Sequence, residues 1–371
     1  MTMTEAQGLR QVGYFDCPGG GQVVVAGEIA YVAHMRAPHG TTIVDVSDPV
    51  RPRKLAELTV PPDVHSHKVR AGDGIMLVNR EPAPGRERGA EVPGGLGIYD
   101  VSRPDHPREI AFWSGGGVHR FTFDGRYAYI SPEVEGYRGN IVMILDLVDP
   151  TRPEEVGRWW MPGQWIAGGE TPSWEGRAHR CHHPIRAANR LYVSYWLGGF
   201  VILDIERMEK PRRVSGFDWS PPFPWPTHTA LPIPFPLGGR RVMLVADEDV
   251  ARPPTEPPSF LWLVDITDET RPVPFASFQV PGVDGSPAPP FTGCHQPCEE
   301  VRGTEIPVAW FAHGLRIVDI KNPHAPREVA SFVPPVPPGA DRVCSNDVCF
   351  DRRGLIYLID RARGLHILER T

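Results

Sequence analysis

The chain has 371 residues, of which 41% are hydrophobic and 23% are charged, so it can bury a substantial core. Its formal net charge is −6 and no basic stripe runs along it, which argues against nucleic acid as a partner. The first eleven residues lack the basic and apolar regions of a signal peptide, and no apolar run is long enough for a membrane span. We therefore expect a cytoplasmic protein with no membrane partner.

One short phrase recurs along the chain: a hydrophobic strand, an aspartate, a tight turn and a proline. It occupies residues 42–52 (TIVDVSDPVRP) and again residues 96–107 (LGIYDVSRPDHP). Further copies centre on Asp146, Asp204, Asp265 and Asp319, and a shortened copy ends near Glu369. The copies follow one another at about 46 to 61 residues, which is the length of a four-stranded propeller blade.

These seven units predict an all-β, seven-bladed propeller that uses residues 1–371 as a single domain. The predicted blades span residues 20–60, 63–113, 115–162, 178–218, 226–281, 293–334 and 343–370. The last unit lacks an outer strand, and residues 9–17 can supply it because they resemble the outer strands of the other units. This pairing would close the ring between the two ends of the chain and remove exposed strand edges.

The IVDVSDP phrases resemble the repeats of the LVIVD-repeat β-propeller family, and the resemblance extends over nearly the whole chain. It implies the fold and not an activity, since one fold hosts many functions. The family resemblance also implies Asp or another polar residue at a position where this chain repeatedly has histidine.

Five histidines occupy that one position in five consecutive units, each just before the first β-prone run: His67, His119, His182, His228 and His295. The innermost strand of each blade lines the central channel, so equivalent positions form a ring that faces the axis. Gly21 and Asn346 complete the ring by register. Because neutral imidazole is a common ligand of transition metals, the pattern predicts a metal centre on the axis. Duplication of one structural histidine is the alternative.

The second strand of each blade ends on the face where the first begins, and this places Glu81, Glu133, Tyr195 and Glu248 near the ring as candidate catalytic residues. Carboxylates there could accept the second N–H of a ligating imidazole, or a Glu or Tyr195 could act as a base. Solvated turn residues are the alternative. His65, two residues before His67, competes with it for the ligand position.

Two tryptophan-rich loops, residues 159–174 and 219–225, should overlie the same face. Long loops in a compact fold are often functional, so we expect an apolar, aromatic-lined entrance for an aromatic or isoprenoid-like substrate. Packing of these tryptophans against the blade edges is the alternative.

The predicted all-histidine centre resembles that of the carotenoid-cleavage oxygenases, propellers in which four histidines hold Fe(II) with glutamates behind them. This resemblance is one of architecture and not of sequence. It implies a mononuclear, non-haem Fe(II) oxygenase acting on an apolar or aromatic organic substrate with O2, with Zn, Mn or Cu as alternative metals. A metal-dependent lyase or hydrolase is the second prediction, and a noncatalytic protein-binding scaffold is the third. Metal analysis separates the enzymes from the scaffold.

Overall fold

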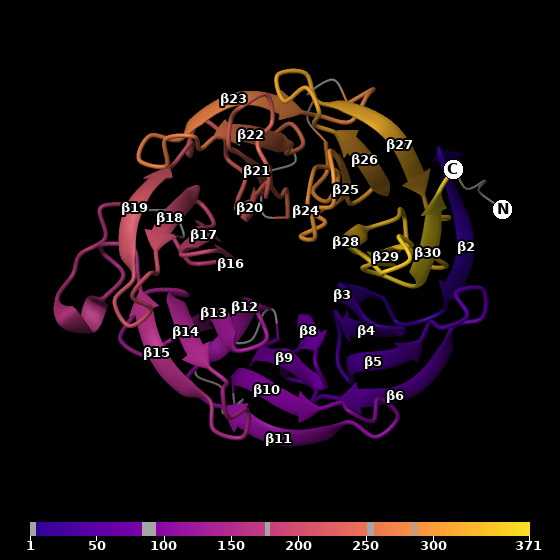
Figure 1. Ribbon diagram of the computed structural model, residues 1–371, viewed down its shortest axis with the longest axis horizontal. Coiled ribbons are helices and arrows are strands. Elements are labelled where there is room, and N and C mark those ends of the chain that lie inside the picture. The colour runs from indigo at the N-terminus through magenta and orange to yellow at the C-terminus, as the bar shows by residue number, and fades with distance from the viewer. Residues whose placement is uncertain (1–4, 84–93, 175–178, 251–255, 284–285, 287) are drawn as a thin grey trace.

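The computed structural model describes residues 5–83, 94–174, 179–250, 256–283, 286 and 288–371. Within these residues, antiparallel strands form seven sheets arranged around one central axis, as Figure 1 shows. A single 3-10 turn, η1 (Ile166–Gly168), is the only helix in the described part of the chain, and no helix there has the length and apolar character to cross a bilayer. The predicted all-β, seven-bladed propeller is therefore confirmed.

Each sheet is one blade, and its strands run from the axis to the rim in chain order. Blade 1 contains β3 (Gly20–Ala26), β4 (Ile29–His34), β5 (His39–Asp45) and β6 (Arg53–Thr59). Blade 2 contains β7 (Val64–His65), β8 (Val69–Gly72), β9 (Ile75–Pro82), β10 (Gly95–Asp100) and β11 (Arg108–Trp113). Blade 3 contains β12 (Gly117–Phe123), β13 (Tyr127–Glu133), β14 (Val142–Asp146) and β15 (Glu154–Trp159). Blade 4 contains β16 (His183–Ala187), β17 (Arg190–Ser194), β18 (Phe200–Asp204) and β19 (Arg212–Phe217).

Blade 5 contains β20 (Thr227–Pro232), β21 (Val242–Asp247), β22 (Leu261–Asp265) and β23 (Val273–Phe278). Blade 6 contains β24 (Gln296–Pro297), β25 (Glu305–Ala309), β26 (Leu315–Asp319) and β27 (Arg327–Val333). Blade 7 contains β28 (Ser345–Phe350), β29 (Ile356–Asp360) and β30 (Leu365–Arg370).

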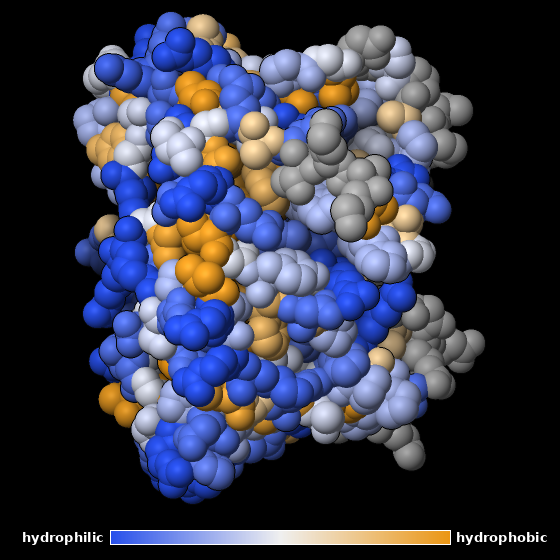
Figure 2. Space-filling view, turned by 90° about the vertical axis from the view of Figure 1, so that its right-hand side faces the viewer, coloured by the Kyte–Doolittle hydropathy of each residue, from blue (hydrophilic) through white to orange (hydrophobic). Residues whose placement is uncertain are grey.

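The N-terminal segment closes the ring. β2 (Leu9–Phe15) pairs antiparallel with β30, from Leu9 opposite Arg370 to Phe15 opposite Leu365, and so becomes the outer strand of blade 7 as predicted. The preceding β1 (Glu5–Gln7) pairs with β27 and adds a fifth strand to blade 6, which the sequence did not indicate. The two ends of the chain therefore join neighbouring blades, and the side of the ring that carries them is mostly hydrophilic (Figure 2).

Hydrophobic cores lie between the blades, one at each of the seven interfaces described. Between blades 3 and 4, for example, Tyr129 and Ile144 pack against Leu191 and Val201, all fully buried. Because both faces of each sheet are covered, the central strands are almost continuously apolar, as in the FVILD of β18. The axial channel is thus held by apolar packing on all sides.

The aspartate of the recurring phrase is a turn cap. Asp45 ends β5, and its Oδ1 accepts the backbone N–H of Ser47 at 2.9 Å. The same bond to the residue two positions further forms at Asp100, Asp146, Asp204, Asp265 and Asp319, at 2.8 to 3.0 Å. This side-chain-to-backbone bond is typical of Asp in turns. The phrase therefore specifies the junction of the third and fourth strands and carries no chemistry of its own.

Candidate metal centre

The first strand of several blades is irregular at the ring position. The pairing register shifts between Val118 and Phe121 in blade 3 and between Thr227 and Thr229 in blade 5. In blade 2 the edge is interrupted between β7 and β8, where His67 lies. Such bulges redirect side chains, so two consecutive residues can face the channel.

The structure brings the five predicted histidines, hereafter the ring histidines, together around the axis. The centroids of successive rings lie 5.2 Å apart for His67 and His119, 4.8 Å for His119 and His182, 4.5 Å for His182 and His228, and 4.1 Å for His228 and His295. Burial lowers the pKa of all five, and that of His119 falls to about 4. These imidazoles are therefore neutral at physiological pH, which metal ligation requires.

Hydrogen bonds at Nδ1 fix the tautomers of the imidazoles. Nδ1 of His182 donates to the backbone carbonyl of His228 at 2.9 Å, and Nδ1 of His295 donates to the carbonyl of Asn346. A carbonyl oxygen can only accept, so Nδ1 carries the proton in both rings and Nε2 keeps a lone pair. A fixed Nδ1–H with a free Nε2 is the usual arrangement of a metal-binding histidine.

Glu81 is the carboxylate behind His119. Its Oε1 and Oε2 lie 2.9 and 3.1 Å from Nδ1 of His119, and its Oε1 also lies 3.3 Å from Nδ1 of His65 and 3.6 Å from Nδ1 of His67. Burial alone would raise the pKa of Glu81, but the facing His119 and His65 outweigh burial and lower it. Glu81 is therefore ionised and leaves the lone pair of His119 on Nε2. His65 stacks on His67 with ring centroids 3.9 Å apart.

Glu248 faces the opposite side of the imidazoles. Its carboxylate oxygens lie 3.9 Å from Nε2 of His182 and 3.6 Å from Nε2 of His295. Burial raises its pKa to about 7, while the positive charges of Arg361 and Lys68 limit the rise. The sequence left two roles open for Glu248, acceptor of an imidazole N–H and base. Its place on the lone-pair side excludes the first role at His182 and His295.

The donor atoms fit a divalent transition metal. Nε2 of His119 and Nε2 of His182 lie 3.1 Å apart, and the bonds at Nδ1 leave a lone pair on each. Two nitrogens bound to one ion at about 2.1 Å are roughly 3.0 Å apart at a right angle and roughly 3.4 Å apart in a tetrahedron. Donor atoms of His182, His228 and Glu248 also lie within 4.8 Å of one another, as do those of His65, His67 and Glu81. A cation would remove the repulsion between the facing lone pairs.

A second layer of buried polar side chains lies one residue beyond the ring positions: Lys68, Arg120, His183, Thr229, Gln296 and Asp347. Arg120 donates to Gln296 at 2.8 Å, and its Nη1 lies 3.3 Å from Nε2 of His228. Thr229 donates its hydroxyl to Gln296 and so accepts the proton of His228 Nδ1 at 2.8 Å. The lone pair of His228 is therefore already bonded by Arg120. The side-chain amide of Asn79 likewise lies 3.5 Å from Nδ1 of His67, where it donates to that ring.

A cavity of about 290 Å³ opens next to His119. Its walls include the predicted residues Glu81 and Glu133, together with His65, Asn140 and Arg180. No Trp, Tyr or Phe lines this cavity among the described residues, so it is a polar entrance and not the expected aromatic one.

The loop tryptophans pack instead among themselves and against the blades. Trp219 stacks on Trp262 with centroids 4.8 Å apart, and the buried Trp225 donates to the carbonyl of Pro257 at 2.8 Å. In the other loop, Trp160 packs edge-on against Trp165. These tryptophans therefore pack against the blades and against one another, which was the alternative to an aromatic-lined entrance.

Tyr195 is not brought to the histidines. Its side chain is fully buried in the core between blades 3 and 4, where the hydroxyl donates to Gln164 and accepts the N–H of Met161 at 3.1 Å. Burial raises its pKa well above the usual value, so the hydroxyl stays protonated and is not available as a base. The next residue, Trp196, faces His182 instead, with ring centroids 5.0 Å apart.

Two arginines and two aromatic residues at the site were not predicted from the sequence. Arg180 lies over the ring of Trp196 at 4.1 Å, and Arg361 lies over that of Phe311 at 5.5 Å. Phe311 packs against His295 with centroids 4.4 Å apart. The signal available was the matching phrases YWLGG and WFAHG, in which both aromatic residues occupy the same place in the repeat.

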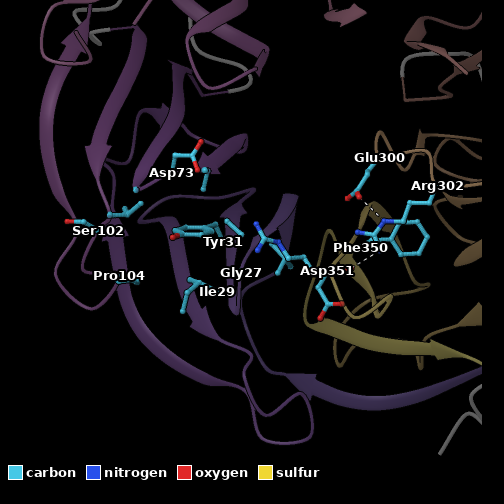
Figure 3. A pocket seen from close by; sticks show the side chains of 17 residues that line it. Gly27, Ile29, Tyr31, Asp73, Ser102, Pro104, Glu300, Arg302, Phe350 and Asp351 are labelled. Atoms are coloured by element: carbon cyan, nitrogen blue, oxygen red, sulfur yellow. Dashed lines mark hydrogen bonds and ion pairs between the residues drawn. The ribbon is translucent and has the colours of Figure 1, made fainter. Parts of the chain in front are cut away.

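A larger cavity, about 560 Å³, lies at the other end of the first strands. Figure 3 shows it between the turns that carry Gly27 and Asp73 on one side and Phe350 and Arg302 on the other. No histidine is among its lining residues, so the clustered donor atoms are absent there. We therefore place the candidate site at the histidine ring and not in the larger cavity.

Comparison with known proteins identifies the repeat. The LVIVD repeat matches residues 20–55 and 307–333, in blades 1 and 6. No curated protein matches the chain.

Solved structures share the fold. A periplasmic gluconolactonase from Pseudomonas aeruginosa is 12% identical with a TM-score of 0.62, covering 89% of this chain and 87% of that chain. A hypothetical selenium-binding protein from Sulfolobus tokodaii is 14% identical with a TM-score of 0.61, covering 90% of this chain and 82% of that chain. The WD40 propeller domain of Doa1 is 8% identical with a TM-score of 0.59, covering 98% of each chain. At such identities the likeness establishes the fold alone.

Proposed function

We propose that this protein is a metalloenzyme that holds one divalent transition-metal ion on the propeller axis. His119, His182 and His295 are the imidazole ligands in this proposal, because each keeps its lone pair on Nε2 while Nδ1 is bonded to Glu81 or to a backbone carbonyl. Glu248 completes the donor set from the lone-pair side. The facing Nε2 atoms of His119 and His182, 3.1 Å apart, are the observation that carries the proposal.

The other two ring histidines, His67 and His228, are not ligands in this proposal. His228 would have to give up the hydrogen bond from Arg120 before it could bind the ion. His67 stacks on His65 and faces Glu81, so this group holds His119 in position. The second nitrogen of a ligating imidazole is usually bonded in this way.

Our first candidate reaction is an oxygenation of a small organic substrate with O2, with Fe(II) as the metal. A largely neutral imidazole set leaves the ion its positive charge, and iron supplies redox chemistry when bound. The chain itself supplies the polar cavity beside His119 for the substrate.

A metal-dependent lyase or hydrolase is the second candidate, and Glu248 favours it. A buried carboxyl with a pKa of about 7 beside the ligand atoms is suited to accept a proton from substrate or water. In that reaction Glu248 is not a ligand but the base, and the imidazoles alone hold the ion, here Zn or Mn, which would polarise the substrate.

Metal analysis of the natively purified protein tests the proposal. We expect about one equivalent of metal in the wild type and in His106→Ala, which changes an exposed histidine at the rim, and little metal in His182→Ala. Bound iron with substrate-dependent oxygen uptake supports the oxygenase, whereas bound zinc or manganese without oxygen uptake supports the lyase or hydrolase. Negligible metal in the wild type, even after reconstitution with Fe(II), Zn, Mn or Cu, would refute both enzyme candidates and favour a noncatalytic scaffold.

A further inference from the structure

The larger cavity continues inward as a second, narrower one. An inner cavity of about 220 Å³ shares Val25, Ala71, Glu300 and Phe350 with the wall of the cavity of about 560 Å³, so the two form one funnel. Figure 3 shows Glu300 and Phe350 together on one side of the outer cavity. The first strands β3, β8 and β28 supply most of the inner wall. The funnel therefore leads toward the axis at the end of these strands that lies away from the ring histidines.

A buried carboxylate with one open oxygen stands in the wall of the inner cavity. Asp347 on β28 lines this cavity and is only 4% exposed. Its Oδ2 accepts the backbone N–H of Val23 at 3.1 Å. Among the described residues, no hydrogen bond or ion pair reaches its Oδ1. Buried carboxylates are normally paired, because burying an unpaired charge is costly. The open oxygen is therefore placed to accept a hydrogen bond from a molecule in the cavity.

Each of the other two carboxylates in this wall has an arginine partner. Arg70 donates to Glu299, and Arg302 donates to Glu300 at 2.7 Å. Asp347 is the third carboxylate of the wall, and no arginine of the described chain pairs with it. The inner wall therefore keeps one uncompensated negative charge, and this charge favours a positively charged ligand.

Two further cations act on Asp347 but do not pair with it. Burial raises the pKa of Asp347 to about 6, and the charges of Arg120 and Lys68 limit the rise. Arg120 donates to Gln296 at 2.8 Å, and the ammonium group of Lys68 donates to the carbonyl of Gly21 at 3.2 Å. Asp347 is therefore ionised at physiological pH while its Oδ1 stays open.

The open carboxylate suits an organic cation better than a metal ion. In the part of the chain that the structure describes, the two groups of three His or Glu side chains with donor atoms within 4.8 Å of one another both lie at the histidine ring. A hard divalent ion needs several oxygen ligands, which a lone carboxylate does not supply. An ammonium group brings its own N–H donors and forms a charge-assisted hydrogen bond with Oδ1. Phe123, Phe350 and Val23 give the carbon part of such a ligand an apolar wall.

We propose that the inner cavity is a binding site for a small organic amine, whose ammonium group donates to Oδ1 of Asp347. The site lies apart from the metal centre and does not rest on the proposed function. The cavity of about 220 Å³ limits the ligand to a small molecule, and the outer cavity gives it a way in.

Calorimetric titration of the natively purified protein with benzylamine, benzyl alcohol and benzoate tests this assignment. At about pH 8 benzylamine is protonated and Asp347 is ionised, so the three probes differ mainly in charge. We expect benzylamine to bind more tightly than the other two probes. Asp347→Asn keeps an acceptor for the N–H of Val23 but removes the charge, so it should weaken benzylamine binding by about 10- to 100-fold. Ala71→Leu narrows the passage between the two cavities and should weaken binding as well.

Asp73→Asn is the matched control, because Asp73 lines the outer cavity and not the inner one, and asparagine tolerates its positive φ of +51°. It should leave benzylamine binding unchanged, and so should His182→Ala, which alters the metal centre. Thermal unfolding shows whether each variant is folded. Wild-type affinity in folded Asp347→Asn, or equal affinity for benzylamine and benzyl alcohol, would overturn the assignment. Loss of benzylamine binding in His182→Ala would overturn it too, because the amine would then bind at the metal centre. If Asp347→Asn does not fold, wild-type affinity in Ala71→Leu overturns the assignment instead.

Discussion

Replacement of Glu81 by glutamine is the sharpest test of how the candidate centre is built. Glu81 accepts the Nδ1–H of His119 at 2.9 Å and faces His65 and His67 as well. The substitution keeps the shape of the side chain and removes the negative charge that raises the basicity of the imidazole. Loss of such a partner behind a metal ligand usually lowers metal affinity by about 10- to 100-fold, or about 1.4 to 2.7 kcal/mol.

The same free energy appears in thermal unfolding, because a ligand that binds only the folded state stabilises it. For 371 residues the entropy of unfolding is roughly 0.8 kcal/mol/K. At saturating metal, Glu81→Gln should therefore unfold about 2 to 3.5 °C below the wild type after correction for the difference between the apo proteins. Calorimetry of apo and metal-loaded protein gives this shift, and competition with a chelator gives the affinity.

Glu57→Gln is the matched control. Glu57 pairs with Nδ1 of His39 on the outer strands of blade 1, so the variant removes a similar pair away from the ring. It should leave metal affinity unchanged. If Glu81→Gln binds metal as tightly as the wild type, Glu81 does not support a metal ligand and the assignment of His119 is wrong.

Three further predictions follow from the packing and the charges. The apo protein should lose stability as the pH falls from 7.5 to 5.5. Burial lowers the pKa of the ring histidines, so the unfolded chain takes up protons over this range while the folded protein does not. Burial raises the pKa of Glu248 to about 7 and that of Asp247 to about 8, so both carboxyl groups take up protons in the folded protein over this range and offset part of the loss. An unchanged urea midpoint would contradict the expected net loss of stability. Deletion of residues 1–15 removes β2 and exposes the edge of β30, so it should speed limited proteolysis and promote association far more than deletion of residues 1–7 does. Tyr195→Phe should cost about 1 kcal/mol of stability, measured by denaturant unfolding, through loss of the bond to Gln164, and a fall in its metal content would contradict this structural role.

The residues of the site could be predicted from the sequence where they recur at one position of the repeat. Because the blades are related by rotation about one axis, residues at the same place in the repeat meet around that axis. The convergence of the five histidines was therefore predictable from the sequence, and so were the closure by β2 and the nearness of Glu81 to the ring. That Glu81 faces His119 was not. The ligand roles of these residues stay predictions.

Predictions from the sequence were wrong where a shift of one residue decides which way a side chain points. Tyr195 and Trp196 are neighbours at the end of one strand, and the chain turns between them, so the hydroxyl enters the core and the indole faces His182. A shift of one residue exchanges the two sides of a strand. The tryptophan loops failed for a different reason, because Trp219 meets Trp262 of a separate strand and composition alone does not reveal such a partner.

By itself, the sequence determined the all-β architecture, the number of blades and the identity of the residues at the axis, since periodic alternation, turn-capping aspartates and a repeated histidine are all local features. Only the tertiary structure decided which side of the imidazoles Glu248 faces, which histidine Arg120 engages, and where Arg180 and Arg361 stand. Those outcomes depend on strand bulges and on turns with positive φ, which couple residues of different blades across the channel.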